Sequence, residues 1–61
     1  MNKQEAMTEV TRINPNATSI AAVAGNGTKP WVQTEFFVRY EGSPLPRRYE
    51  LRTDGLLWLQ R

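Results

Sequence analysis

The chain has 61 residues and a mass of 7.0 kDa, which allows one domain with a small core but not separate catalytic and binding domains. It contains no cysteine and no histidine, which removes disulfides, thiol chemistry and the usual ligands of zinc, haem and iron–sulfur clusters. Eight basic and six acidic residues give a net charge of +2, which is only a weak sign of an anionic partner. We expect a single domain over residues 1–61 with no cofactor and no metal.

The sequence contains no segment that suggests a membrane or secretory destination. No apolar run approaches the roughly 18 residues that a transmembrane helix requires. Residues 1–5 are polar apart from Met1 and lack the apolar stretch of a signal peptide. Together with the absence of cysteine, these features predict a cytoplasmic protein that does not contact membranes.

The N-terminal segment supports two interpretations. Apolar residues recur at steps of three and four, as in an amphipathic helix over residues 2–13: Ala6, Met7, Val10 and Ile13. Residues 8–13, however, are rich in β-branched side chains, which favour strands. We favour a strand over residues 8–13 preceded by a flexible arm over residues 1–7, and we keep the helix as the alternative.

Two turns flank a short apolar segment. Residues 14–17 read Asn-Pro-Asn-Ala, in which proline presets a turn and the asparagine side chains can bond locally. Residues 18–24 are small and mostly apolar, and we interpret them as a buried strand rather than a very short helix. Residues 25–28 read Gly-Asn-Gly-Thr, a hairpin turn signal.

The clearest strand covers residues 31–40. Its even positions all favour β structure and alternate with a more mixed set, which fits a strand with one buried face. A proline-containing loop over residues 41–46 leads to a second alternating segment at residues 47–52. The alternation predicts the buried residues: Val32, Phe36, Val38, Tyr49 and Leu51.

The chain closes with a second hairpin. Asp54-Gly55 is a turn signal, and residues 56–59 form an apolar last strand. The predicted fold is therefore mainly β: a small antiparallel meander of about five strands, curled into a sheet or an SH3-like barrel. The alternative is a β-sheet with one N-terminal helix packed on it.

Catalysis is not expected. The acidic residues are scattered, and Glu35 and Glu50, which can face each other across strands, are expected on solvent faces among arginines. The serine hydroxyls of Ser19 and Ser43 have no adjacent base. We therefore predict that the protein is not an enzyme.

Arginines and aromatic residues supply the candidate binding site. Arg39, Arg48 and Arg52 are expected on neighbouring strands, near aromatic side chains that do not fit the core parity. The candidate residues are Trp31, Phe37, Arg39, Arg47, Arg48, Arg52 and Trp58. Arginine beside exposed aromatic rings can hold single-stranded nucleic acid. The competing interpretation is that Glu35, Glu41 and Glu50 neutralise these arginines as cross-strand pairs on a solvated face.

The leading functional hypothesis is a non-catalytic module that binds another protein, because tryptophan and arginine are enriched at interface hot spots. Small inhibitors and adaptors encoded by phages and other mobile elements share this size and lack of catalytic groups. The alternative is a small nucleic-acid-binding β domain. The apolar last strand, residues 56–59, has no proline or charge, so we also expect a homodimer through this edge, with Trp58 near its symmetry mate.

Overall fold

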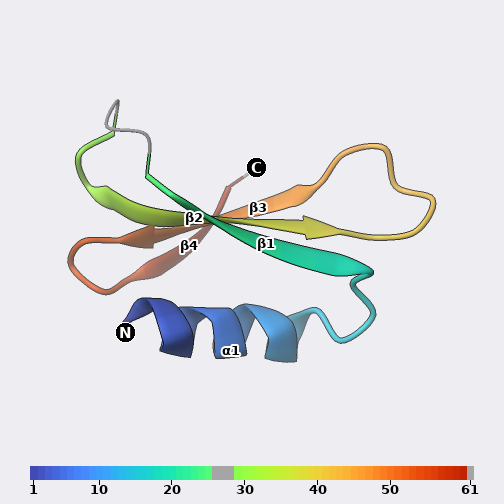
Figure 1. The fold of residues 1–61 in the computed structure, drawn as a ribbon, viewed down its shortest axis with the longest axis horizontal. Coiled ribbons are helices and arrows are strands. Elements are labelled where there is room, and N and C mark those ends of the chain that lie inside the picture. Colours follow the sequence, from blue (N-terminus) through green and yellow to red (C-terminus); the bar gives the residue numbers. More distant parts are fainter. Residues whose placement is uncertain (26–28, 61) are drawn as a thin grey trace.

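The computed structural model describes residues 1–25 and 29–60, and it consists of one helix followed by an antiparallel sheet (Figure 1). The elements are α1 (Lys3–Ile13), β1 (Ser19–Ala24), β2 (Val32–Arg39), β3 (Arg47–Arg52) and β4 (Leu57–Gln60). The prediction of a mainly β protein is confirmed, with the N-terminal helix that was its alternative form. The predicted turn at residues 25–28 lies largely outside the described residues.

The sheet is an open meander in the order β1-β2-β3-β4, and every strand pairs antiparallel with its neighbour in sequence. The strands predicted from residues 18–24, 31–40, 47–52 and 56–59 are all present within a residue or two of their expected bounds. Alternation located β2 and β3, whereas β1 and β4 were predicted from their apolar composition between turns. The expectation that residues 18–24 are a buried strand is wrong, because β1 is an edge strand with no buried residue. Within the described residues the sheet has four strands rather than five, and β1 and β4 remain at its two edges.

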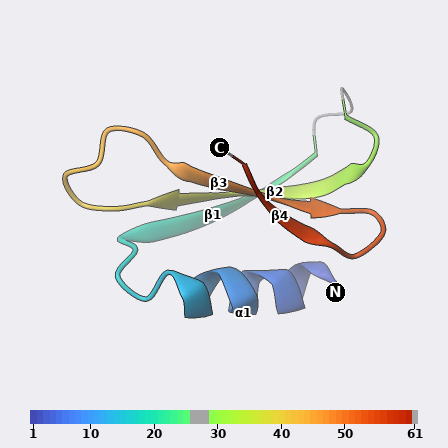
Figure 2. The same ribbon diagram turned by 180° about the vertical axis from the view of Figure 1, so that it is seen from behind.

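Helix α1 lies along one face of the twisted sheet, while no helix of the described residues covers the opposite face (Figures 1 and 2). The core lies between the two layers and is formed by Ala6, Val10, Phe36, Val38, Tyr49 and Leu51. The five residues predicted to be buried from the strand pattern are all buried. The structure is therefore asymmetric: one sheet face is packed, and the other faces outward.

The strand predicted over residues 8–13, with its flexible arm over residues 1–7, is wrong because these residues form α1. The helix begins at a capping box, in which the Asn2 side chain accepts the Glu5 N–H and the Glu5 side chain accepts the Asn2 N–H. Ala6 and Val10, one turn apart, are fully buried against the sheet. Because the segment is helical, it cannot close β4 into the barrel that the sequence suggested.

Asn14 ends the helix and joins it to the sheet. Its backbone N–H donates to Val10 and Thr11, and its side-chain amide donates to the Val10 carbonyl (2.9 Å) and the Tyr49 hydroxyl (3.1 Å). The Tyr40 hydroxyl donates to the Asn14 side-chain oxygen. This buried amide therefore fixes the helix position relative to the strands that carry the candidate surface.

Across residues 1–25 and 29–60, no helix has both the length and the apolar content needed to cross a bilayer.

Candidate interaction surfaces

The sheet face opposite α1, which we call the open face, carries most of the predicted site residues. Its members follow from the strand register, which places them on the side away from Phe36 and Leu51. They are Val23, Glu35, Phe37, Arg39, Arg48, Glu50, Arg52 and Trp58. The open face thus combines three aliphatic or aromatic side chains, two carboxylates and three arginines, on strands that pack against the core behind them.

Arg52 and Trp58 form one unit at the β3–β4 end of the open face. The Arg52 guanidinium carbon lies 5.8 Å from the centre of the Trp58 ring, within cation–π range. Arg52 also donates to Asp54 in the following turn at 3.2 Å. Trp58 is 51% exposed. A half-exposed indole is therefore held in place by an arginine that is itself oriented by a carboxylate.

The same turn holds Asp54 in its charged form. Its carboxylate accepts the backbone N–H of Leu56 at 3.2 Å and the side chain of Arg52. These two interactions, the Leu56 bond first, lower the pKa of Asp54 below its ordinary value of 3.8. Gly55 completes the turn with φ +89°, a conformation that residues with a side chain rarely adopt.

Glu50 is buried, although the sequence placed it on a solvated face. It is 4% exposed, lies opposite Glu35 on β2 and Trp58 on β4, and pairs with Lys29 at 3.3 Å. The facing of Glu35 and Glu50 across strands is confirmed. The reason for the burial is the neighbouring Trp58 and Lys29 side chains, which a strand pattern alone does not locate.

Arg39 and Arg48 are the exposed cations of the open face. Phe37 lies opposite Arg48, so Arg39, two residues further along β2, is the diagonal neighbour of Arg48. Neither arginine takes part in an ion pair within the described residues, where the pairs are Arg12–Glu9, Lys29–Glu50 and Arg52–Asp54. The predicted neutralisation of these arginines by Glu35, Glu41 and Glu50 is thus not seen among the described residues.

Two predicted site residues lie away from this group. Arg47 pairs with Val38, whose side chain belongs to the core, and the Arg47 guanidinium lies over the Tyr40 ring at 5.7 Å. Trp31 precedes β2, is 46% exposed, and accepts the Thr53 N–H through its carbonyl. The structure therefore brings together Phe37, Arg39, Arg48, Arg52 and Trp58, with Trp31 beside the β3–β4 turn and Arg47 on the helix side.

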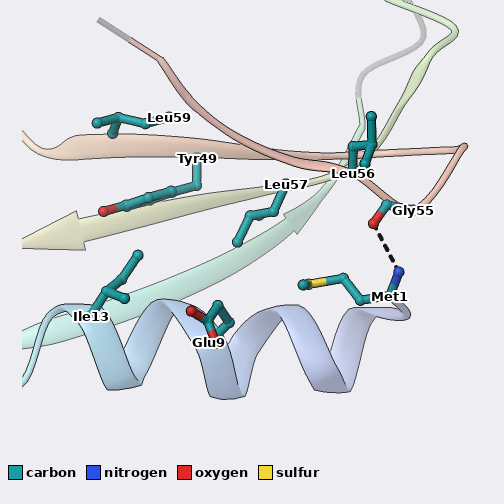
Figure 3. A pocket seen from close by; sticks show the side chains of 8 residues that line it. All are labelled: Met1, Glu9, Ile13, Tyr49, Gly55, Leu56, Leu57 and Leu59. Atoms are coloured by element: carbon teal, nitrogen blue, oxygen red, sulfur yellow. Dashed lines mark hydrogen bonds between the residues drawn. The ribbon is translucent and has the colours of Figure 1, made fainter.

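A second surface, which we call the β4 groove, runs between α1 and β4 on the helix side (Figure 3). It is a largely apolar hollow of about 440 Å³, lined by Met1, Glu9, Ile13, Tyr49, Gly55, Leu56, Leu57 and Leu59. Figure 3 shows Leu57 pointing from β4 toward the helix, with Met1 at one end of α1 and Ile13 at the other end, below Tyr49. Because α1 lies over the centre of the sheet, the apolar side chains near β4 remain partly uncovered.

The sequence predicted β4 as an apolar edge but not the helix half of this groove. Ile13 was assigned to a strand and Met1 to a flexible arm, whereas the Met1 amino group donates to the Gly55 carbonyl at 2.8 Å. Ile13 is 41% exposed despite its size. The helical spacing of Ile13 with Val10 and Ala6 was the available signal, and it was outweighed by β-branching.

The described residues contain no group of three or more acidic side chains arranged to hold a metal ion. Glu9 pairs with Arg12 on the helix surface, and this hydrogen bond lowers the pKa of Glu9. The two surfaces carry charged groups, aromatic rings and apolar side chains.

Comparison of the chain with protein-family models, with curated proteins and with solved structures gives no match in any of the three.

Proposed function

We propose that this protein is a non-catalytic binding module whose open face docks onto an acidic, partly apolar surface of another protein. The observation that carries the proposal is that exposed Arg39 and Arg48 lie on the same sheet face as half-exposed Trp58, and that none of the described elements covers this face. Arginine and tryptophan are the residue types most enriched at protein interface hot spots. An inhibitor or adaptor that acts by occluding its partner needs no more than such a surface.

Carboxylates on the open face favour a protein over a nucleic acid as the binding partner. Glu35 lies at the middle of the sheet opposite Glu50, which is buried and paired with Lys29, so the Glu35 carboxylate would repel a phosphate backbone that crosses the face. Base stacking also requires free aromatic faces, and Arg52 already lies over the Trp58 ring. Arg39 and Arg48 lie toward one end of the face, where they can pair with discrete acidic side chains of a protein partner.

The module is expected to act as a preformed surface. The strands of the open face are backed by a packed core, and the Arg52–Trp58 pair is held by Asp54. Preorganised side chains lose little conformational entropy on binding. The lack of cysteine favours a reducing compartment such as the cytoplasm.

A charge-reversal pull-down tests the proposal. Immobilised wild type, Arg48→Glu and the charge-matched control Lys3→Glu, which alters α1, are incubated with nuclease-treated lysate and compared by quantitative mass spectrometry. We expect a specific protein retained by wild type and Lys3→Glu and reduced at least about tenfold by Arg48→Glu, as loss of a charged hot spot predicts. Circular dichroism verifies that all three are folded.

Nucleic-acid binding is the outcome that would replace this proposal. Fluorescence anisotropy with labelled single-stranded DNA and RNA, measured over a salt series, is the matching experiment. Binding that weakens steeply with salt and is lost in Arg48→Glu, with no protein dependent on Arg48, would show a nucleic-acid module instead. A set of captured proteins that is identical for Arg48→Glu and Lys3→Glu would refute the docking role of the open face.

A further inference from the structure

The free edge of the sheet at β4 has a defined set of unpaired backbone groups. The Arg52 N–H donates to the Leu56 carbonyl at 2.8 Å, and Leu51 lies opposite Leu57 in the β3–β4 register. In an antiparallel ladder, hydrogen-bonded and non-hydrogen-bonded pairs alternate. Trp58 therefore bonds to β3, whereas the N–H and C=O groups of Leu57 and Leu59 point away from the sheet.

Exposed apolar side chains gather around this same edge. Leu59 and Leu56 are 45% and 54% exposed and line the β4 groove together with Met1 and Ile13, while Trp58 lies on the other face of the strand. Leu57–Gln60 contains no charge and no proline, the devices that usually protect an edge strand from pairing. Both the unpaired backbone groups and the exposed apolar side chains of β4 are therefore available to pair with another strand.

We propose that β4 pairs antiparallel with β4 of a second copy, about a two-fold axis that passes beside Trp58 and perpendicular to the sheet. Such an axis preserves the two faces, so only residues on the same face can lie opposite each other. With the axis at Trp58, Leu57 and Leu59 form hydrogen-bonded pairs with the partner's Leu59 and Leu57. The backbone N–H and C=O groups of Leu57 and Leu59 that point away from β3 are then all hydrogen-bonded to the second copy.

Two neighbouring registers leave more backbone groups of the β4 edge without a hydrogen bond. With the axis at Leu57 or at Leu59, only one of these residues bonds to its counterpart, and the other lies beyond the paired part of the partner strand. The axis at Trp58 also places only uncharged residues opposite each other, with the two indoles forming a direct, non-hydrogen-bonded pair on the open face. Aromatic cross-strand pairs of this kind stabilise sheets.

The second copy pairs with β4 rather than β1 because pairing at β4 buries more apolar side-chain area. In β1, the Gly25 N–H bonds to the Gln33 carbonyl, and by the same alternation Ile20, Ala22 and Ala24 carry the outward groups. Alanine side chains bury little apolar area, whereas leucine and tryptophan bury far more. In the β4 pairing, both helices lie on one side of a continuous sheet and both open faces lie on the other. This self-pairing does not rest on the proposed partner docking, although Trp58 belongs to both surfaces.

Disulfide capture tests the register directly, since the native chain has no cysteine. In a non-hydrogen-bonded pair the Cα atoms are about 4.5 Å apart, within the range of a disulfide. Trp58→Cys should therefore form a covalent dimer under mild oxidation, more than about tenfold faster than Val23→Cys, the corresponding open-face position on β1. Non-reducing electrophoresis measures both rates.

Proline substitution tests the edge without altering the bonds inside the sheet. Leu59→Pro removes an outward N–H, so it should abolish dimerisation of the wild-type chain in sedimentation experiments and block capture of Trp58→Cys, while leaving the strand signal in circular dichroism. Ala22→Pro, which removes an outward N–H on β1, should change neither. A wild-type chain that stays monomeric up to submillimolar concentration, equal capture of Trp58→Cys and Val23→Cys, or loss of dimer only in Ala22→Pro would each overturn the proposal.

Discussion

At the scale of single residues, Asn14 makes long-range hydrogen bonds that its sequence context does not predict. The Asn-Pro-Asn motif predicted a local turn, and Asn14 does end a helix. Its side chain, however, bonds to Tyr49, which is 35 positions away, and accepts from Tyr40. Asn14 itself is only 2% exposed. Composition and spacing along the chain predict local bonds well, but they carry no signal for partners that meet only after the sheet has formed.

We expect Asn14→Ala to lower the free energy of unfolding by about 1–3 kcal/mol, because the buried Tyr49 hydroxyl and the partly buried Tyr40 hydroxyl lose a partner. Urea denaturation followed by tryptophan fluorescence measures the change. Asn16→Ala, an exposed change in the same turn, is the matched control and should stay within about 0.5 kcal/mol of wild type. Equal effects of the two substitutions would show that the buried network contributes nothing to stability.

At the scale of elements, the local sequence pattern was enough to predict the strands but not the helix. Alternation predicted β2 and β3 because one face of each is buried in the core. In α1, by contrast, β-branched residues favoured a strand and the capping box favoured a helix. The threonine hydroxyls of Thr8 and Thr11 bond to carbonyls four residues earlier, which accommodates them in the helix. Burial of Ala6 and Val10 against the sheet then decided the outcome, and that contact is tertiary.

The β3–β4 hairpin gives a prediction about pH. The pKa of Asp54 is lower in the folded chain than its ordinary value of 3.8, so ionised Asp54 stabilises the fold. This stabilisation is present above the unfolded pKa and is lost as the pH falls through the lowered folded pKa. Asp54→Asn should therefore be less stable than wild type at neutral pH, and the difference should shrink toward zero in strong acid.

Thermal unfolding at several pH values measures this difference. Glu41→Gln, which removes an exposed carboxylate from the β2–β3 loop, is the control for a general loss of negative charge. A gap between Asp54→Asn and wild type that stays constant from neutral to acidic pH would mean that the Asp54 charge does not stabilise the turn.

At the scale of the whole molecule, the two faces of the sheet determine what sequence could and could not predict about the site. The parity of β2 and β3 separated Phe36 from Phe37 and correctly placed Arg39, Arg48 and Arg52 away from the core, whereas Arg47, grouped with them as a site residue, lies on the helix side. It did not show that a helix would cover the predicted buried face, nor that Glu50 would be buried beside Trp58 and Lys29. Those outcomes depend on how layers stack and on long side chains that reach across strands.

Adjacent phenylalanines on opposite faces allow a direct test of this asymmetry. Phe36 is fully buried under α1, whereas Phe37 is partly exposed on the open face. Phe36→Ala should cost about 3–5 kcal/mol, a large part of the stability of a small domain, and Phe37→Ala should cost clearly less. Phe36→Leu, a milder change, provides a measurable value if Phe36→Ala does not fold. Chemical denaturation that shows equal losses at the two positions would contradict the one-sided core.

The meander order has a consequence for the kinetics of folding. Each strand pairs with the strand next to it in sequence, so the sheet can form hairpin by hairpin, with only short loops to close. Docking of α1, secured by the bond between Asn14 and Tyr49, is the step that joins distant parts of the chain. We therefore expect rapid folding for a mainly β protein, with a barrier set by the arrival of the helix on an already paired sheet.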